Sequence, residues 1–134
     1  PHAGSWSESQ VVRRGQELNQ PLIARVLDKR QPGNRPLPAT HSFFQVDGSG
    51  VILDAVKLSE DGKGFIFRLY EANGKAENAS LRFFCTPVRA VATDLLEKET
   101  GEMKLKDGRL ELSFRAFEIK TVKVSFAELE EAPK

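Results

Sequence analysis

The chain is poor in the residues that carry most enzyme chemistry. Its 134 residues include one cysteine, two histidines and one tryptophan. A single cysteine excludes an intrachain disulfide, and Cys85 ends the apolar run Leu81–Cys85, where we expect it to be a small buried hydrophobe. A lone thiol is compatible with a reducing compartment, so we expect a cytoplasmic protein.

Long apolar runs and an excess of one charge are also lacking. No stretch approaches the roughly 20 apolar residues of a membrane helix, and the first residues lack a signal-peptide pattern. Twenty Lys and Arg against nineteen Asp and Glu leave a formal charge of +1. Because affinity for nucleic acid comes largely from concentrated positive charge, we expect neither a nucleic-acid nor a membrane partner.

The dominant pattern is an alternation of apolar and polar residues from Ser42 onward. It is clearest in two segments, whose same-face residues are Phe65, Phe67 and Leu69 in one and Ala79, Leu81 and Phe83 in the other. A period of two is typical of half-buried strands, and Asn73-Gly74 marks the connection between these two. Many short strands with turn signals predict an all-β fold, an antiparallel β-sandwich over residues 42–127.

Two segments allow a sharper prediction. A two-residue turn at Asp107-Gly108 would pair Leu105 with Leu110, Lys104 with Glu111, and Met103 with Leu112. Further on, the apolar positions shift from Phe117 and Ile119 to Val122, Val124 and Phe126. This shift predicts either a bulge or corner near Lys120-Thr121, or burial on both faces.

The first 41 residues are the least β-like. Ser7-x-x-Gln10 resembles a capping box before Val11, which predicts one short helix that Pro21 would end. We expect a strand over Leu22–Leu27, a mobile loop over residues 28–41 because of its prolines and glycine, and a frayed tail over residues 128–134.

Several short segments match the signatures of a known family, in the same order. They are Pro1–Trp6, Leu18–Leu22, Val51–Lys57, Ser59–Gly62, Phe65–Ala72, Thr93–Glu97 and Phe117–Thr121. Together these segments resemble the C-terminal β-domain of glycoside hydrolase family 38, the zinc-dependent α-mannosidases. The resemblance implies a fragment of a galactose-mutarotase-like supersandwich, in which residues 1–27 continue from an upstream β-domain.

The resemblance also implies a function for a longer parent enzyme. The parent would remove terminal α-linked mannose from a glycan with retention of configuration, and its zinc and nucleophilic aspartate would lie in an α/β barrel outside this chain. We therefore expect a structural domain, inactive alone, whose partners are the catalytic barrel and the upstream β-domains. A strand edge without its neighbour also favours self-association.

Candidate chemical groups within the chain are few. A retaining glycosidase needs two carboxyl groups about 5 to 5.5 Å apart, but Asp54 and Asp61 are explained by an outward strand position and a turn. Zinc needs three or four converging ligands, and His2 and His41 have no second ligand at helical or turn spacing. We assign no catalytic, cofactor-binding or metal-binding residue.

Two other groups of residues have a functional alternative. Gly48, Gly50, Gly62 and Gly64 flank strands without opening a helix, so we interpret them as hairpin turns and not as a phosphate-binding loop. Trp6, Phe44, Tyr70 and Phe84 could stack on sugar rings. A carbohydrate-binding or protein-interaction module is therefore the alternative to a supporting domain.

Overall fold

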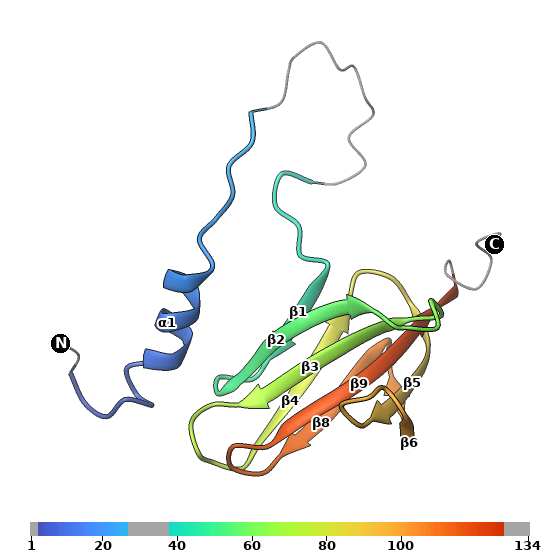
Figure 1. The fold of residues 1–134 in the computed structure, drawn as a ribbon. Helices are drawn as coiled ribbons and strands as arrows, with labels where there is room; N and C mark the ends of the chain where they lie inside the picture. The colour runs from blue at the N-terminus through green and yellow to red at the C-terminus, as the bar shows by residue number, and fades with distance from the viewer. Residues whose placement is uncertain (1–2, 27–37, 128–134) are drawn as a thin grey trace. The chain divides into compact units, whose positions relative to one another are not determined.

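The computed structural model describes residues 3–26 and 38–127 (Figure 1). Contacts divide the chain into a first unit, Pro1–Ser42, and a second unit, Phe43–Lys134. The predicted tail at 128–134, Leu27 and residues 28–37 of the predicted loop lie outside the described residues.

The first unit contains helix α1 (Val11–Asn19), as predicted. The predicted Ser7–Gln10 capping box is wrong, because Gln10 at the N-cap makes no side-chain cap bond. The reciprocal bonds form two residues earlier, where the Ser5 N–H donates to Glu8 Oε2 at 2.8 Å and the Glu8 N–H donates to Ser5 Oγ at 3.3 Å. A carboxylate is a stronger acceptor than the Gln10 amide, which favours this position.

The chain leaves α1 as predicted but does not form the next predicted element. Gln20 caps the C-terminus of the helix and Pro21 follows, where a helix cannot continue. The prediction of a strand over Leu22–Leu27 is wrong for its described part, because residues 22–26 have no regular structure. A strand needs a neighbouring edge to pair with, and these residues join neither sheet.

The second unit is an antiparallel sandwich of two sheets, which confirms the predicted all-β fold (Figure 1). The strands are β1 (Phe44–Asp47), β2 (Val51–Leu58), β3 (Phe65–Glu71), β4 (Glu77–Phe83), β5 (Pro87–Thr93), β6 (Glu99–Met103), β7 (Leu105–Lys106), β8 (Arg109–Phe114) and β9 (Ile119–Phe126). The four-stranded sheet has the order β1-β4-β8-β7, and the five-stranded sheet has the order β2-β3-β9-β5-β6.

The core lies between the two sheets. The five-stranded sheet contributes Phe67 and Leu69 and the four-stranded sheet contributes Leu81 and Leu110, all fully buried in one hydrophobic cluster. Phe65 and Phe83 pack against the same cluster. The predicted same-face residues of β3 and β4 are therefore the inner faces of the two sheets.

The predicted turn at Asp107-Gly108 is confirmed. Leu105 pairs with Leu110 across it, and both turn residues have positive φ, 50° and 72°. Two positive φ angles give the type I′ geometry whose twist matches that of paired strands, and glycine adopts such an angle without steric cost.

The pairing predicted for this hairpin beyond Leu105 is wrong. Met103 belongs to β6 and pairs with Ala90 of β5, not with Leu112. The β7–β8 ladder contains only the pairs Leu105–Leu110 and Lys106–Arg109, so Glu111 is not paired with Lys104. The chain crosses from the five-stranded to the four-stranded sheet between Met103 and Leu105, and this crossing ends the hairpin.

Two explanations were predicted for the shift of apolar positions near Lys120-Thr121, a bulge or corner and burial on both faces. The structure shows the second. β9 pairs with β3 on one side and β5 on the other, with no register shift along Ile119–Val124 on the β3 side. Every residue from Thr121 to Phe126 is buried. The chain turns earlier than expected, at Phe117, whose φ is 58°.

Candidate functional site

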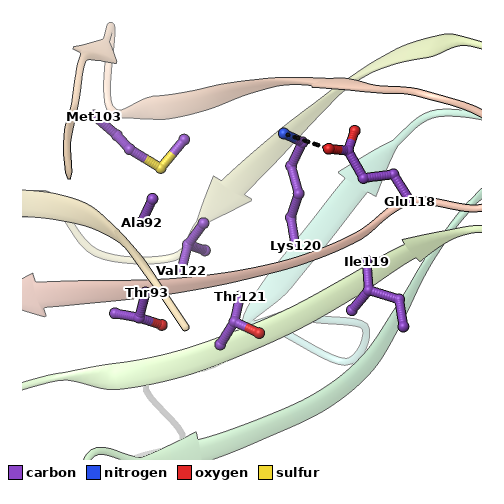
Figure 2. A pocket seen from close by; sticks show the side chains of 8 residues that line it. All are labelled: Ala92, Thr93, Met103, Glu118, Ile119, Lys120, Thr121 and Val122. Atoms are coloured by element: carbon purple, nitrogen blue, oxygen red, sulfur yellow. Dashed lines mark ion pairs between the residues drawn. The ribbon is translucent and has the colours of Figure 1, made fainter. Parts of the chain in front are cut away.

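A pocket of about 180 Å³ lies beside the first residues of β9 (Figure 2). Its lining residues are Ala92, Thr93, Met103, Glu118, Ile119, Lys120, Thr121 and Val122. In Figure 2 the side chains of Met103 and Lys120 extend to one side of the sheet, whereas those of Thr93 and Thr121 extend to the other. The polar groups of the lining therefore do not converge on one point.

Glu118 is the carboxylate of this pocket, and neighbouring basic residues and a backbone N–H bind it. It accepts hydrogen bonds from the Arg115 N–H at 2.8 Å and from Arg115 Nη2 at 3.1 Å, and it lies 3.5 Å from Lys120 Nζ. These donors hold the pKa of Glu118 below its ordinary value, the Arg115 N–H first among them. Because a general acid needs a raised pKa, and because retention needs two carboxyl groups, the lining does not form a glycosidase centre.

A second carboxylate, Glu71 at the end of β3, is 1% exposed and organises two turns. It accepts backbone N–H bonds from Asn73 at 2.7 Å, Gly74 at 2.9 Å, Lys75 at 3.3 Å and Phe117 at 3.0 Å. Burial alone raises the pKa of Glu71, but the four N–H donors outweigh it, so its pKa is lowered. Glu71 was not a predicted site residue; an acidic residue between an apolar strand and Asn-Gly was the available signal.

Glu77 performs a similar task at the β1–β2 turn. Its carboxylate accepts the Gly50 N–H at 2.9 Å and the Ser49 hydroxyl at 3.2 Å. A Cβ at Gly50 would lie 2.6 Å from Asn73 Nδ2 and closer still to Glu77, so a side chain at position 50 would displace these polar groups. Both glutamates thus serve backbone geometry.

The outer face of the five-stranded sheet carries a network of ion pairs. Lys123 of β9, with a side chain 10% exposed, places Nζ 2.6 Å from Asp61 Oδ2 and 3.8 Å from Glu99 Oε1. Arg89 binds Glu99 at 2.8 Å and also binds Glu102, and these two carboxylates raise the pKa of Arg89. The network covers polar residues that would otherwise be buried without partners.

The β5–β6 turn reaches the β2–β3 hairpin on this outer face. Glu97 forms an ion pair with Lys57 and accepts the Glu60 N–H at 2.9 Å. Lys57, then the Glu60 N–H, hold the pKa of Glu97 below its ordinary value. The charged side chains here therefore link strands that are distant in sequence.

The two aspartates weighed as a catalytic pair lie apart. Asp54 is exposed on β2, at the register shift between Leu53 and Ala55. Asp61 lies beyond the end of β2, which puts on the order of 13 Å of strand between Asp54 and Leu58 alone. Lys123, then the Ser59 hydroxyl and the Lys63 N–H, hold the pKa of Asp61 well below its usual range.

A zinc site does not fit the residues described. His2 lies outside them, and His41 is exposed in the segment before β1. Within residues 3–26 and 38–127, no three His, Cys, Asp or Glu side chains are grouped so as to hold a metal ion. Zinc sites use three or four such ligands, so no step of a reaction is derived through zinc here.

The aromatic residues considered for stacking on sugar rings are in different places. Phe44 and Phe84 lie with ring centroids 6.4 Å apart, whereas Tyr70 is on the other face of β3 from Phe67. Trp6 belongs to the first unit. The three aromatic residues of the second unit therefore do not form one sugar-stacking platform.

The glycines and the cysteine have structural positions. Gly62 and Gly64 lie in the β2–β3 hairpin, as predicted, but Gly48 and Gly50 connect strands of different sheets and are not in a hairpin. Cys85 is half-buried and packs against the core. Among helices of the described residues, none has the length and apolarity of a membrane span.

Comparisons with known proteins agree with this architecture. The family model described as "Glycosyl hydrolases family 38 C-terminal beta sandwich domain" matches residues 50–122. The chain is 34% identical over 125 residues to "Alpha-mannosidase 2C1" of Homo sapiens, covering 89% of this chain and 11% of that protein. The Mus musculus protein of the same name is 34% identical over 128 residues, covering 91% of this chain and 12% of its own length.

A more distant relative extends the same pattern. "Alpha-mannosidase G" of Dictyostelium discoideum is 25% identical over 124 residues, covering 90% of this chain and 11% of its own length. The chain thus spans 11 to 12% of the length of the relatives it matches. The match from residue 50 to residue 122 begins in the β1–β2 turn and ends within β9, so it includes strands of both sheets. This chain belongs to the C-terminal β-sandwich domains of glycosyl hydrolase family 38.

Proposed function

We propose that this chain is the C-terminal supporting domain of a longer α-mannosidase that hydrolyses terminal α-linked mannose with retention of configuration. The observation that carries the proposal is the family match over residues 50–122, together with relatives that are named α-mannosidases. Because the chain corresponds to 11% of the human relative, the catalytic barrel, its zinc and the glycan-binding cleft would lie in the remaining length of the parent.

The use of the carboxylates supports a structural and not a catalytic role. Glu71 and Glu77 accept backbone N–H groups, and Asp61 binds Lys123. The pKa values of Glu71 and Asp61 are lowered, which keeps both groups ionised at neutral pH. A glycosidase acid needs the opposite shift, so these groups are suited to holding turns in place.

The proposed partners are parts of the same parent enzyme. The domain would pack on the catalytic barrel and on β-domains that precede it, in a reducing compartment compatible with the single Cys85. β1 and β2 are edge strands of their sheets, with backbone groups available on one side. Self-association through these edges is part of the proposal for the isolated chain.

The experiment compares the full-length parent with the isolated chain. With an aryl α-mannoside and zinc, the parent is expected to release the aryl group and the isolated chain is expected to show no turnover. In the parent, Asp54→Asn and Glu118→Gln should leave kcat unchanged, because neither group is placed in the chemistry. Hydrolysis by the isolated chain that these substitutions abolish would contradict the proposal.

Calorimetry separates the supporting role from the alternative of a carbohydrate-binding module. Titration of the chain with a mannose-rich glycan is expected to give no saturable heat. Saturable binding that is lost in Phe84→Ala but kept in Phe117→Ala would favour the binding module instead.

A further inference from the structure

One end of the sandwich leaves large apolar side chains in contact with water. They are Phe43, Val56, Leu58, Phe84 and Val88, which are between 39% and 54% exposed. Phe43 and Phe84 alone expose on the order of 200 Å² of ring surface, taking half of a typical aromatic side chain for each. We call these five residues the phenylalanine end. Apolar patches of a few hundred Å² on a folded domain mark interaction sites.

Ring contacts connect this surface to the core. The rings of Phe43 and Phe84 pack edge to face with centroids 5.1 Å apart, and Phe44 lies 6.4 Å from Phe84 and 6.3 Å from Phe65. Leu58 is the strand partner of Phe65. Because Phe84 and Leu58 adjoin packed side chains, their part of the surface is held in a defined shape, which lowers the entropic cost of binding to it.

The exposure results from the unequal coverage of the two sheets. Val56 and Leu58 pair with Phe67 and Phe65, so they lie on the inner face of β2. β1, the edge strand of the other sheet, begins only at Phe44. The inner face of β2 therefore extends beyond its cover, and a further apolar surface is needed to bury Val56 and Leu58.

Both connections out of the sandwich are at this end. β1 begins where β4 ends, since Phe44 pairs with Phe83, and β9 ends where β5 begins, since Phe126 pairs with Pro87. The rings of Phe83 and Phe126 are 5.5 Å apart. Figure 1 shows the start of β1 and the end of β9 on the same side of the sandwich. Both connections therefore leave the sandwich at the phenylalanine end.

We propose that the phenylalanine end is the surface on which a neighbouring domain of the same longer polypeptide docks, through an apolar patch of its own. This inference rests on the proposed function, since it requires a longer parent chain, and the part matched here is only 11% of the human relative. A tether raises the effective concentration of the neighbouring domain to the millimolar range, so a patch of this modest size is sufficient. Charged residues gather instead on the outer face of the five-stranded sheet, which leaves this end suited to an apolar partner.

The other exposed apolar residues fit this role less well. Leu95 and Leu96 lie in the β5–β6 turn, and Phe117 and Ile119 lie at the start of β9. Phe117 already packs on Gly74, where a Cβ would lie 2.6 Å from its ring. Phe117 and Ile119 are at the end of β9 opposite to Phe126, whereas the turn with Leu95 and Leu96 lies on the outer face of the five-stranded sheet, where Glu97 binds Lys57. Leu95 and Leu96 are therefore exposed apolar controls that lie off the inner face of β2.

The test is photo-cross-linking in the full-length parent enzyme. A benzoylphenylalanine replaces Val88 in one variant and Leu96 in another, and mass spectrometry identifies the cross-linked peptides. We expect position 88 to link to a peptide of the same polypeptide outside these 134 residues, and position 96 to form no such link. Leu58→Asp should abolish most of the link from position 88, whereas Leu95→Asp should leave it unchanged.

Each other outcome overturns the inference. A link from position 88 to a second copy assigns the surface to self-association, and a link to residues 1–42 assigns it to the chain itself. No link from position 88, or an equal link from position 96, shows that this end is not the docking surface. Hydrolysis of an aryl α-mannoside is measured on the same preparations, so an active parent without the link refutes the inference alone, and an inactive parent refutes the proposed function.

Discussion

Glu71 shows how much structure one side chain holds. Its carboxylate accepts N–H bonds from three residues of the β3–β4 connection and from Phe117, which is 46 residues further along the chain. Because the carboxylate is buried, it depends on these four N–H donors, and each donor gains a charge-assisted bond from it. The conformations of both turns therefore depend on a negative charge at position 71.

Glu71→Gln should destabilise the domain. Glutamine keeps the shape but presents an NH2 group to some of the N–H donors, so we expect the free energy of unfolding to fall by about 2 kcal/mol. Urea unfolding followed by circular dichroism measures it. Glu111→Gln, at an exposed position of β8, is the control and should change the free energy by less than about 0.5 kcal/mol. Equal effects of the two substitutions would contradict the role of Glu71.

The lowered pKa of Glu71 also predicts how stability depends on pH. In the unfolded chain the ordinary value is 4.5, so near that pH the unfolded state binds more protons than the folded state. The stabilisation is therefore present above this value and is lost as the pH falls through the lower folded-state pKa. We expect the free energy of unfolding to decrease from about pH 5 to pH 3, and less steeply in Glu71→Gln. Parallel pH curves for the two proteins would exclude Glu71 as a cause.

At the scale of elements, the β2–β3 hairpin is attached to β9 by an ion pair whose two side chains differ in their exposure to water. The Lys123 side chain is 10% exposed, whereas the Asp61 side chain is 45% exposed. Removing the partner of a buried charge costs more than removing the partner of one that water can reach. The two halves of the pair should therefore respond differently to substitution.

Asp61→Asn should destabilise the domain more than Lys123→Met. Asparagine still accepts the bonds from Ser59 and Lys63 but leaves the Lys123 ammonium with Glu99 alone, at a cost of about 1 to 2 kcal/mol. In Lys123→Met the Asp61 carboxylate regains water, so a change of less than about 1 kcal/mol is expected. Urea unfolding of both variants and of the double variant measures the coupling, and a larger loss in Lys123→Met would refute the asymmetry.

Gly108 in the β7–β8 turn has a matched control in Gly101, which lies in β6. Gly108 has φ +72°, whereas Gly101 in β6 has open space around the position of a Cβ and no positive φ. Gly108→Ala should cost about 1 kcal/mol through backbone strain, and Gly101→Ala should be neutral or slightly stabilising because alanine restricts the unfolded chain. Thermal unfolding measures both. A greater loss at position 101 would show that the turn does not control this hairpin.

At the scale of the whole sandwich, the two sheets share one core. Leu81 of the four-stranded sheet and Phe67 of the five-stranded sheet are both fully buried in the same cluster. Neither sheet can keep its inner face dry alone, so the second unit should unfold in a single transition.

Leu81→Ala tests this shared core. We expect a loss of about 3 kcal/mol in the free energy of unfolding, from lost burial and the remaining cavity, with hydrogen exchange accelerated in strands of both sheets. Leu96→Ala, at a position 85% exposed, is the control and should have little effect. Faster exchange confined to β4 and its neighbours in the four-stranded sheet would show that the sheets are separate folding units.

Local chemistry made much of this molecule predictable. Alternating apolar residues are sufficient to predict β3 and β4 and their inner faces, because side chains of a strand point to opposite sides in turn. Asp107-Gly108 predicts its own turn, since the required backbone angles depend on those two residues alone. The resemblance of short segments to the mannosidase family is likewise a property of the residues in order.

Contacts between distant segments account for what prediction missed. Met103 pairs in a different sheet from Leu105, although only Lys104 separates them. Glu71 depends on the N–H of Phe117, and Lys123 on a carboxylate 62 residues before it. A pattern of neighbouring residues specifies which face of a strand is apolar, but pairing between sheets and partners for buried charges form only when the whole chain packs, because those contacts join groups that no local spacing relates.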